Sequence, residues 1–223
     1  MKYAVCDTAV PQERRQETNE KLLYLIDSGK AGEYGISGGD IYNLYTGDGG
    51  LHGLRRQDYE NYASYSEAKK EIENGQFFTP PLLCRLVAEA LSPPPDAAVA
   101  DLTCGAGAFF NFMPAENNLY GCELDIKAYK VAGYLYPHAN LVNGDIRSYQ
   151  PPVRFDYVVG NPPYNLRWCV DDGEKILSQL YYCRKAAELL KPFGILAMIV
   201  PASFLSDDFS DGTSIREMEE RFS

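Results

Sequence analysis

The sequence of 223 residues has few of the residues that build metal centres and little positive charge. It contains only two histidines, and none of its six cysteines belongs to a Cys-x-x-Cys pair. Neither a zinc cluster nor a disulfide framework is therefore expected, and no metal site is predicted. The 21 lysines and arginines are outnumbered by 31 aspartates and glutamates, a formal net charge of −10. Because proteins that bind nucleic acid alone usually have a basic face, we expect any such contact to need further protein.

Long hydrophobic runs are also missing. The longest apolar stretch, residues 195–201, is far shorter than the roughly 20 residues of a membrane span. No charged leader followed by an apolar run opens the chain. Apolar residues nevertheless make up 45% of the sequence, enough for one full core. We therefore expect a soluble, cytoplasmic protein with reduced thiols and no membrane partner.

The first 75 residues differ in composition from the rest. Leucines and isoleucine on one face predict a helix over 17–28 that stops before Gly29. Eight of the 19 glycines lie between positions 32 and 53 and indicate loop structure, with turns at 38–39 and 48–50. A second helix is predicted over 58–74, whose tyrosines we assign to packing rather than to a base-stacking surface. We treat residues 1–75 as an N-terminal extension, helical and rich in Gly and Tyr.

Short apolar segments alternate with helical ones after residue 75. Strands are predicted over 97–102, 119–122, 139–143, 157–160 and 194–200. Helices are predicted over 80–91, 109–113, 126–136, 174–190 and 214–222. This alternation predicts an α/β fold with a doubly wound, mostly parallel sheet in residues 76–223.

Glycines and an acidic residue follow the first two strands. Residues 101–107 read Asp-Leu-Thr-Cys-Gly-Ala-Gly, and glycines there let the backbone turn tightly and approach a ligand. Glu123 lies 18 residues past Gly105, where a carboxylate can accept hydrogen bonds from both ribose hydroxyls of an adenosine. A dinucleotide fold would have a third glycine at position 110, which is Phe110. The pocket therefore suits adenosine without a pyrophosphate.

Two further polar segments follow the third and fourth strands. Asn143-Gly144-Asp145 alone reads as a turn, but its register with Asp101 and Glu123 favours an acceptor for the exocyclic amine of an adenine. Residues 161–164 read Asn-Pro-Pro-Tyr, a tetrapeptide expected by chance only about a few times per thousand chains of this size. A rigid turn is the alternative interpretation. The tetrapeptide follows the fourth strand, beside the point where the strand order of such sheets reverses, and this position favours a role in a ligand-binding cleft instead.

These segments resemble the N6-adenine DNA methyltransferases of the gamma arrangement, found in type I and type II restriction-modification systems. The similarity covers about residues 76–222. Residues 76–81 are similar to motif ten of that family, 101–109 to motif one, Glu123 to motif two, Asp145 to motif three and 161–164 to motif four. The strand at 195–201, with residues 202–204, is similar to the segment that follows motif four in that family. Six motifs in the family's order make the resemblance specific.

The resemblance implies a Rossmann-like fold of the class I S-adenosylmethionine-dependent methyltransferases. It implies that Thr79 and Asp101 hold the methionine end of the cofactor S-adenosylmethionine, Glu123 its ribose and Asp145 its adenine. The further cofactor contacts that it implies are Cys104, Gly105, Gly107, Phe109, Ile146 and Pro163. The implied catalytic segment is Asn161, Pro162, Pro163 and Tyr164.

The implied reaction is methyl transfer to the exocyclic N6 amine of an adenine in DNA. That amine is a poor nucleophile, and acceptors at Asn161 and the Pro162 carbonyl would localise its lone pair, so that transfer rests on positioning and oriented dipoles. The adenine must flip out of the duplex, and Tyr164 would stack on it. Methyltransferases acting on RNA amines or on protein glutamine share the Asn-Pro-Pro-Tyr segment, and a non-catalytic binding module is a further alternative.

The chain departs from the family at its end. Family members continue into a hairpin, which completes the sheet and supplies a second aromatic wall for the flipped base, and then into a target-recognition domain. This sequence stops at Ser223. We therefore expect a portion of a larger protein that contacts DNA mainly through regions beyond this chain. The sheet edge left incomplete is expected to favour self-association.

Overall fold

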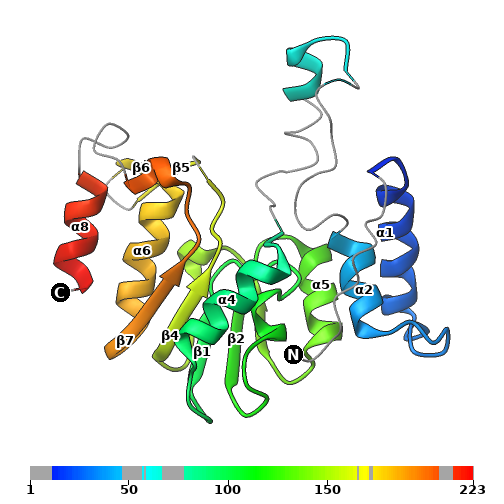
Figure 1. The fold of residues 1–223 in the computed structure, drawn as a ribbon, viewed down its shortest axis with the longest axis horizontal. Helices are drawn as coiled ribbons and strands as arrows, with labels where there is room; N and C mark the ends of the chain where they lie inside the picture. The colour runs from blue at the N-terminus through cyan, green and yellow to red at the C-terminus, as the bar shows by residue number, and fades with distance from the viewer. Residues whose placement is uncertain are drawn as a thin grey trace.

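A five-stranded parallel sheet forms the centre of the computed structural model (Figure 1). The residues that the structure describes are 12–46, 57, 59–66, 78–164, 166–170, 173–205 and 213–222. The strand order is β3-β2-β1-β4-β7, so the order in which strands are added to the sheet reverses between β1 and β4. The strands of this sheet are β1 (Ala98–Asp101), β2 (Asn118–Glu123), β3 (Asn140–Asn143), β4 (Phe155–Gly160) and β7 (Leu190–Met198). The predicted doubly wound, mostly parallel fold is confirmed.

The crossover connections between the parallel strands contain an α-helix or a short 3₁₀ helix, and further α-helices precede and follow the sheet. Helix α4 (Pro81–Leu91) starts with proline in its first turn, and α5 (Ile126–Leu135) is capped by Asp125, whose carboxylate accepts from the Lys127 amide at 2.6 Å. Helices α6 (Ser178–Leu189) and α8 (Thr213–Phe222) pack against each other. Short 3₁₀ helices span Phe109–Asn111, Ile146–Ser148 and Ala202–Leu205.

The sheet has a separate hydrophobic layer on each face. Val99 of β1 belongs to one buried cluster with side chains of α4 and α5, while its neighbours Ala98 and Ala100 belong to another with α6. Successive side chains of a strand point to opposite faces, so a central strand must be apolar throughout. All four residues of β1 are buried accordingly.

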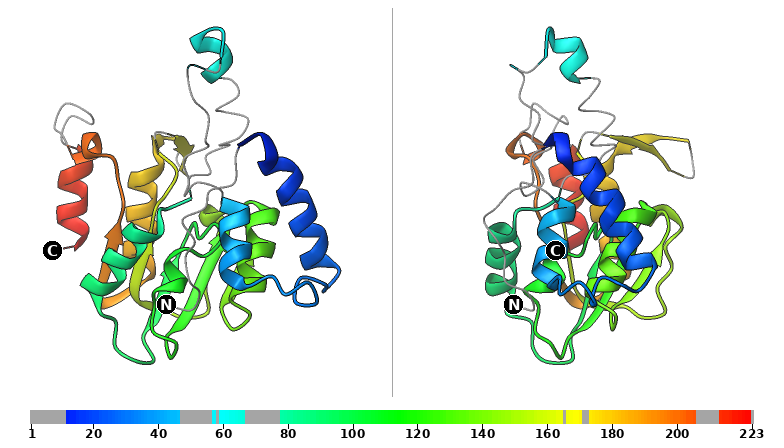
Figure 2. Two further views of the ribbon diagram at one scale, coloured as in Figure 1. Left: turned by 45° about the vertical axis from the view of Figure 1, so that its right-hand side comes forward. Right: turned by 90° about the vertical axis from the view of Figure 1, so that its right-hand side faces the viewer.

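The N-terminal helices pack on the same face as α5. Helix α1 (Gln12–Asp27) is joined to α5 by an ion pair between Lys130 Nζ and Asp27 Oδ2 at 2.7 Å. Leu22 of α1 and Ile41 of α2 (Gly38–Thr46) belong to the same buried cluster as the α5 side chains. Figure 2 shows α1 and α2 beside α5 in both views. The hydrophobic core therefore extends across residue 75.

The glycine-rich segment was wrongly predicted as a loop with a turn at 38–39. Residues 38–46 form α2, because Ser37 and Asp40 cap it reciprocally: the Asp40 amide donates to Ser37 Oγ at 3.1 Å and the Ser37 amide to Asp40 Oδ2 at 3.0 Å. The predicted turn at 48–50 lies outside the described residues. Of the helix predicted over 58–74, residues 62–66 are helical, and most of the rest lies outside the described residues.

A hairpin replaces the start of the helix predicted over 174–190. Strands β5 (Arg167–Cys169) and β6 (Lys175–Leu177) pair antiparallel, and only from Ser178 is the chain helical. Gly173, with φ of 84°, lies in the connection. The helix predicted over 109–113 is a single 3₁₀ turn, and β7 begins four residues before its predicted start at 194, with a register shift opposite β4.

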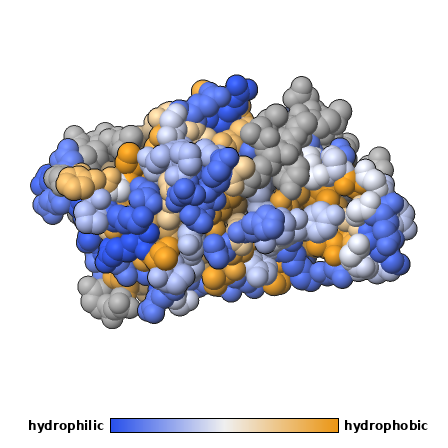
Figure 3. Space-filling view, turned by 90° about the horizontal axis from the view of Figure 1, so that it is seen from below, coloured by the Kyte–Doolittle hydropathy of each residue, from blue (hydrophilic) through white to orange (hydrophobic). Residues whose placement is uncertain are grey.

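Two surfaces lie away from the strand ends at which the site is expected: the opposite end of the sheet and the outer edge of β7. Figure 3 shows the end at which the strands begin, a hydrophilic surface interrupted by separate apolar areas. Strand β7 lies at one edge of the sheet, and within the described ranges no strand pairs with its outer side. No helix in the described part of the chain is long and apolar enough to cross a membrane.

Candidate active site

A cleft of about 450 Å³ opens where strands β1 to β4 end. This is the crevice at which open parallel sheets bind ligands, beside the point where strand order reverses. Each of these strand ends contributes a segment to its wall, and Trp168 of β5 lines it as well. The lining residues are Phe78, Leu102, Thr103, Gly105, Glu123, Leu124, Asp125, Ile126, Gly144, Asp145, Ile146, Arg147, Asn161, Pro163, Leu166 and Trp168.

The loop after β1 needs glycine at two positions. Gly105 and Gly107 have φ values of 54° and 81°, which L side chains rarely adopt. A Cβ on Gly107 would also lie 2.5 Å from the Tyr136 ring, whereas one on Gly105 would meet the Phe78 ring at 3.5 Å. The Gly105 backbone thus faces the cleft, while Gly107 is packed against the protein behind it.

Glu123 joins this loop to the end of β2. One carboxylate oxygen accepts a hydrogen bond from the Gly105 amide at 2.7 Å, and the other accepts from the Asp125 amide at 2.8 Å. The side chain is buried, and this burial raises the pKa of its carboxyl despite both hydrogen bonds. Each oxygen keeps a second lone pair for a ligand in the cleft.

Asp101 lies behind the cleft rather than in its wall. Its Oδ1 accepts from the Thr103 amide at 3.1 Å, and the side chain is buried at the end of β1. Burial, with a smaller contribution from the nearby charge of Glu123, raises the pKa of Asp101 to about 7. A positively charged ligand group nearby would favour the ionised form.

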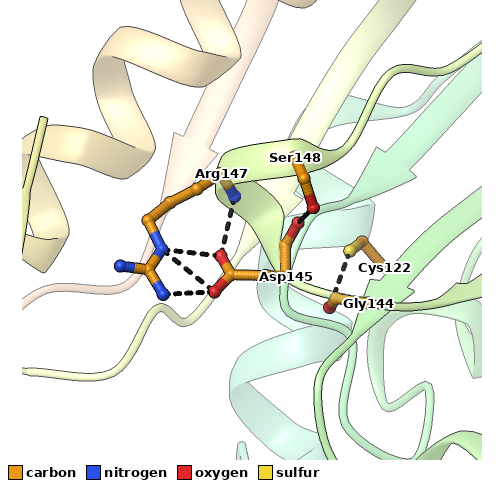
Figure 4. Close-up of polar contacts among 5 residues, drawn as sticks. All are labelled: Cys122, Gly144, Asp145, Arg147 and Ser148. Carbon is orange, nitrogen blue, oxygen red and sulfur yellow. Dashed lines mark hydrogen bonds and ion pairs between the residues drawn. The ribbon is translucent and has the colours of Figure 1, made fainter. Parts of the chain in front are cut away.

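Asp145 is paired with Arg147 in the loop after β3 (Figure 4). The Arg147 side chain donates from Nε to both carboxylate oxygens at 2.9 Å, and its backbone amide donates to Oδ1 at 2.8 Å. These contacts, chiefly the side-chain hydrogen bonds, hold the pKa of Asp145 below its usual value. Both residues line the cleft, so an arginine accompanies the acceptor predicted for the adenine amine.

The Asn-Pro-Pro-Tyr turn follows β4 and is anchored by α6. Asn161 and Pro163 line the cleft, and Pro162 is buried. The Ser178 hydroxyl donates to the Pro163 carbonyl at 2.6 Å, which fixes the turn on the start of α6. The Tyr164 hydroxyl donates to the Asn161 side-chain oxygen and lies 3.2 Å from the Ile199 carbonyl. The half-buried Tyr164 therefore contacts the side chain predicted to bind the target amine.

The structure brings about half of the predicted site residues into one cleft. Those that line it are Gly105, Glu123, Asp145, Ile146, Asn161 and Pro163. The others are not among the lining residues: Thr79, Asp101, Cys104, Gly107, Phe109, Pro162 and Tyr164. Residues 76 and 77 of the predicted motif ten lie outside the described residues.

Ten of the sixteen lining residues were not predicted as site residues, among them Phe78, Arg147 and Trp168. Trp168, the only tryptophan of the chain, lies on β5 and packs edge-on against Tyr181 with ring centroids 5.6 Å apart. Phe78 belongs to the segment similar to motif ten, which was a signal for it. Trp168 had no such signal, because its hairpin was not predicted.

The fold and the cleft together define a class I methyltransferase fold. A class I S-adenosylmethionine-dependent methyltransferase from Listeria monocytogenes superposes with a TM-score of 0.54 at 12% identity, over 92% of this chain and 78% of that one. A type I restriction-modification methyltransferase subunit from Streptococcus thermophilus superposes equally well, at 20% identity over 81% of this chain and 46% of that one.

The chain belongs to the N-6 DNA Methylase family, whose model matches residues 57–218. It is 32% identical over 161 residues to the type II methyltransferase M.TthHB8I of Thermus thermophilus. This match covers 61% of this chain and 37% of that protein. It is 27% identical over 154 residues to the type II methyltransferase M.CvrRI of a Paramecium bursaria Chlorella virus, covering 63% and 40%. The chain thus spans about two fifths of the length of these relatives.

Proposed function

We propose that this chain carries the catalytic core of an S-adenosylmethionine-dependent methyltransferase that acts on the N6 amine of adenine in DNA. One observation supports this most strongly. Asn161, the acceptor suited to a substrate amine, lines the same cleft as Glu123, the acceptor suited to a ribose. A methyl donor bound along the ends of β1 to β3 would therefore meet a substrate held at the end of β4.

The residues of the cleft fit the cofactor. Glu123 offers two carboxylate oxygens to the ribose hydroxyls, and Gly105 lets the donor approach the backbone. Ile146 and Trp168 offer apolar surface to an adenine ring, while Asp145 and Arg147 offer polar groups to its edge. Asp101, buried behind the loop, supplies negative charge near the methionine end. When bound, the cofactor supplies an electrophilic methyl group.

The Asn-Pro-Pro-Tyr turn would orient the nucleophile. The Asn161 side-chain oxygen and the Pro162 carbonyl would accept the two amine hydrogens and so direct the nitrogen lone pair towards the cleft. The prolines restrict the backbone of the turn, and Ser178 holds it from below through the Pro163 carbonyl. The Asn161 oxygen that accepts from the Tyr164 hydroxyl keeps a second lone pair for the amine, and the Tyr164 ring would move from this position to stack on the flipped base.

DNA is the substrate that the comparisons favour. The matching family model describes DNA methylases, and the two curated relatives reported above are type II methyltransferases. RNA amines and protein glutamine are the alternative substrates, and both are included in the test below.

Two measurements test this proposal. Calorimetric titration of the chain with S-adenosylhomocysteine should show a one-to-one complex, and the fluorescence of Trp168 should change with the same binding curve because it is the only tryptophan and lines the cleft. Transfer of labelled methyl groups to DNA, RNA and protein pools should then be measured with the natural polypeptide that contains these residues. Label in RNA or protein but not in DNA would exclude the proposed substrate.

A further inference from the structure

Helix α2 lies outside the part of the chain that matches the family model. The match begins at residue 57, whereas α2 spans Gly38–Thr46. The helix is nevertheless built into the core: Ile41, Tyr42 and Tyr45 are all buried in the cluster that also contains side chains of α5. Its reciprocal cap at Ser37 and Asp40 fixes where it begins.

One contact runs from α2 to the cleft through Phe78. The Tyr45 ring, 3% exposed, meets the Phe78 ring edge-on with centroids 5.5 Å apart. Phe78 lines the cleft, and its ring lies 3.5 Å from the position of a Cβ on Gly105. Tyr45 thus packs against the aromatic side chain that borders the glycine loop.

A second contact runs from α2 to the back of the same loop. Tyr42 is buried next to Tyr136 and Cys84, and its burial, together with these neighbours, raises the pKa of its hydroxyl. The Tyr136 ring occupies the space beside Gly107 and packs edge-on against Phe110 at 5.6 Å. Helix α2 therefore supports the loop at both of its glycines, from two directions.

We propose that α2 is part of the cofactor site, with Tyr45 as the residue that positions Phe78 against Gly105. The proposal rests on the proposed function for the identity of the ligand, a sulfonium or thioether adenosine compound. The N-terminal helices then set cofactor affinity through the shape of the wall, without contacting the cofactor themselves. A cleft whose wall already has its ligand-bound conformation binds the ligand more tightly, because fewer side chains must become ordered on binding.

The effect of removing Tyr45 follows from the geometry. Without the tyrosine ring, Phe78 loses its edge-to-face partner and gains rotamers that leave the wall. Aromatic pairs of this kind contribute enough to change affinity by about 3- to 10-fold. The loss should appear in binding of the cofactor and not in the rate of methyl transfer at saturating cofactor.

The experiment is calorimetric titration of the whole chain with S-adenosylhomocysteine. Tyr45→Ala should weaken binding about 3- to 10-fold, and Tyr45→Phe, which keeps the ring edge, should stay within about twofold of the unmodified chain. Tyr24→Ala is the matched control, a tyrosine on α1 that is 65% exposed, and it should bind unchanged. Circular dichroism tests whether each variant is folded.

A double-mutant cycle separates positioning from general destabilisation. Phe78→Leu and Tyr45→Leu remove the ring but keep a large apolar side chain, and each should weaken binding. The double variant should bind no more weakly than the single variant with the lower affinity. Additive losses of affinity in the double variant would overturn the proposal, and so would a folded Tyr45→Ala chain that binds like the unmodified one. If Tyr45→Ala does not fold, the cycle with the leucine variants decides. Failure of the unmodified chain to bind S-adenosylhomocysteine would instead refute the proposed function.

Discussion

Replacement of Glu123 by alanine tests the cofactor half of the site. The carboxylate already accepts hydrogen bonds from the Gly105 and Asp125 amides at 2.7 and 2.8 Å, so a bound ribose uses its remaining lone pairs. A hydrogen bond to a charged group contributes about 1.5 to 3 kcal/mol. Loss of one such contact therefore weakens binding by about 1.5 to 3 kcal/mol, which is about 10- to 150-fold.

The same substitution has a second, separable effect. Alanine leaves the Gly105 and Asp125 amides without their acceptor, so the free energy of unfolding should fall by about 1 to 3 kcal/mol as well. Calorimetric titration with S-adenosylhomocysteine, at a temperature where both proteins are folded, measures the affinity, and urea unfolding measures the stability. Glu89→Ala removes an exposed carboxylate from α4 and is the control.

The result that would refute this reasoning is specific. If Glu123→Ala is folded and binds S-adenosylhomocysteine as tightly as the unmodified chain, Glu123 does not contact the ribose. A loss of stability without a loss of affinity would leave Glu123 only as the group that holds the glycine loop.

The remaining predictions concern the substrate half of the site, pH and DNA. Asn161→Ala should leave cofactor affinity nearly unchanged but abolish methyl transfer by the natural polypeptide, since its contact with the amine is made chiefly in the transition state; a full rate in single-turnover assays would contradict that role. Tyr164→Ala should weaken capture of a flipped base by about 1 to 3 kcal/mol, with Phe or Trp at this position restoring it, as measured by binding of DNA that carries a mismatched target. Because burial raises the pKa of Asp101 to about 7, its protonated form favours the folded state. That stabilisation is fully present below the unfolded pKa and is lost as pH rises through 7, so Asp101→Asn should flatten the decrease in melting temperature between pH 5 and 8; an unaltered pH profile would show that Asp101 is not the titrating group. The isolated chain, with a formal net charge of −10, should bind duplex DNA weakly at physiological salt. Tight binding in a gel-shift assay would contradict the inference that the chain has no basic face for DNA.

The parts of the fold predicted from the sequence are those encoded by local patterns. Buried parallel strands must be apolar on both faces, so short runs such as Tyr157-Val158-Val159 identify the strands with little ambiguity. Polar residues that interrupt the pattern at a strand end, such as Glu123 and Asn161, then mark the cleft, because parallel strands end at the same edge.

The errors arose where two local signals competed. Gly38-Gly39 favoured a turn, but the Ser37 and Asp40 cap and the buried face with Tyr45 favoured a helix, and tertiary packing decided for the helix. The helix predicted over 174–190 begins only at Ser178, because residues 175–177 form β6; Asp172-Gly173, just before them, is a typical hairpin dipeptide.

Contacts between distant segments could not be predicted at all. Tyr45 and Phe78 are separated by 33 positions, and no periodicity connects a helix of the extension to a residue of the cleft. Even the pairing of Asp145 with Arg147, two residues apart, depends on the 3₁₀ turn that brings the guanidinium back over the carboxylate. Such contacts depend on three-dimensional packing, which a single sequence does not encode in its local pattern.

The most direct test is mass-spectrometric analysis of nucleosides from DNA incubated with labelled S-adenosylmethionine and the natural polypeptide that contains this chain. We predict labelled N6-methyladenine as the product, and none with the Asn161→Ala variant, which should still bind the cofactor. Label on cytosine, on RNA or on protein, or N6-methyladenine formed undiminished by Asn161→Ala, would contradict the assignment of this cleft to adenine methylation.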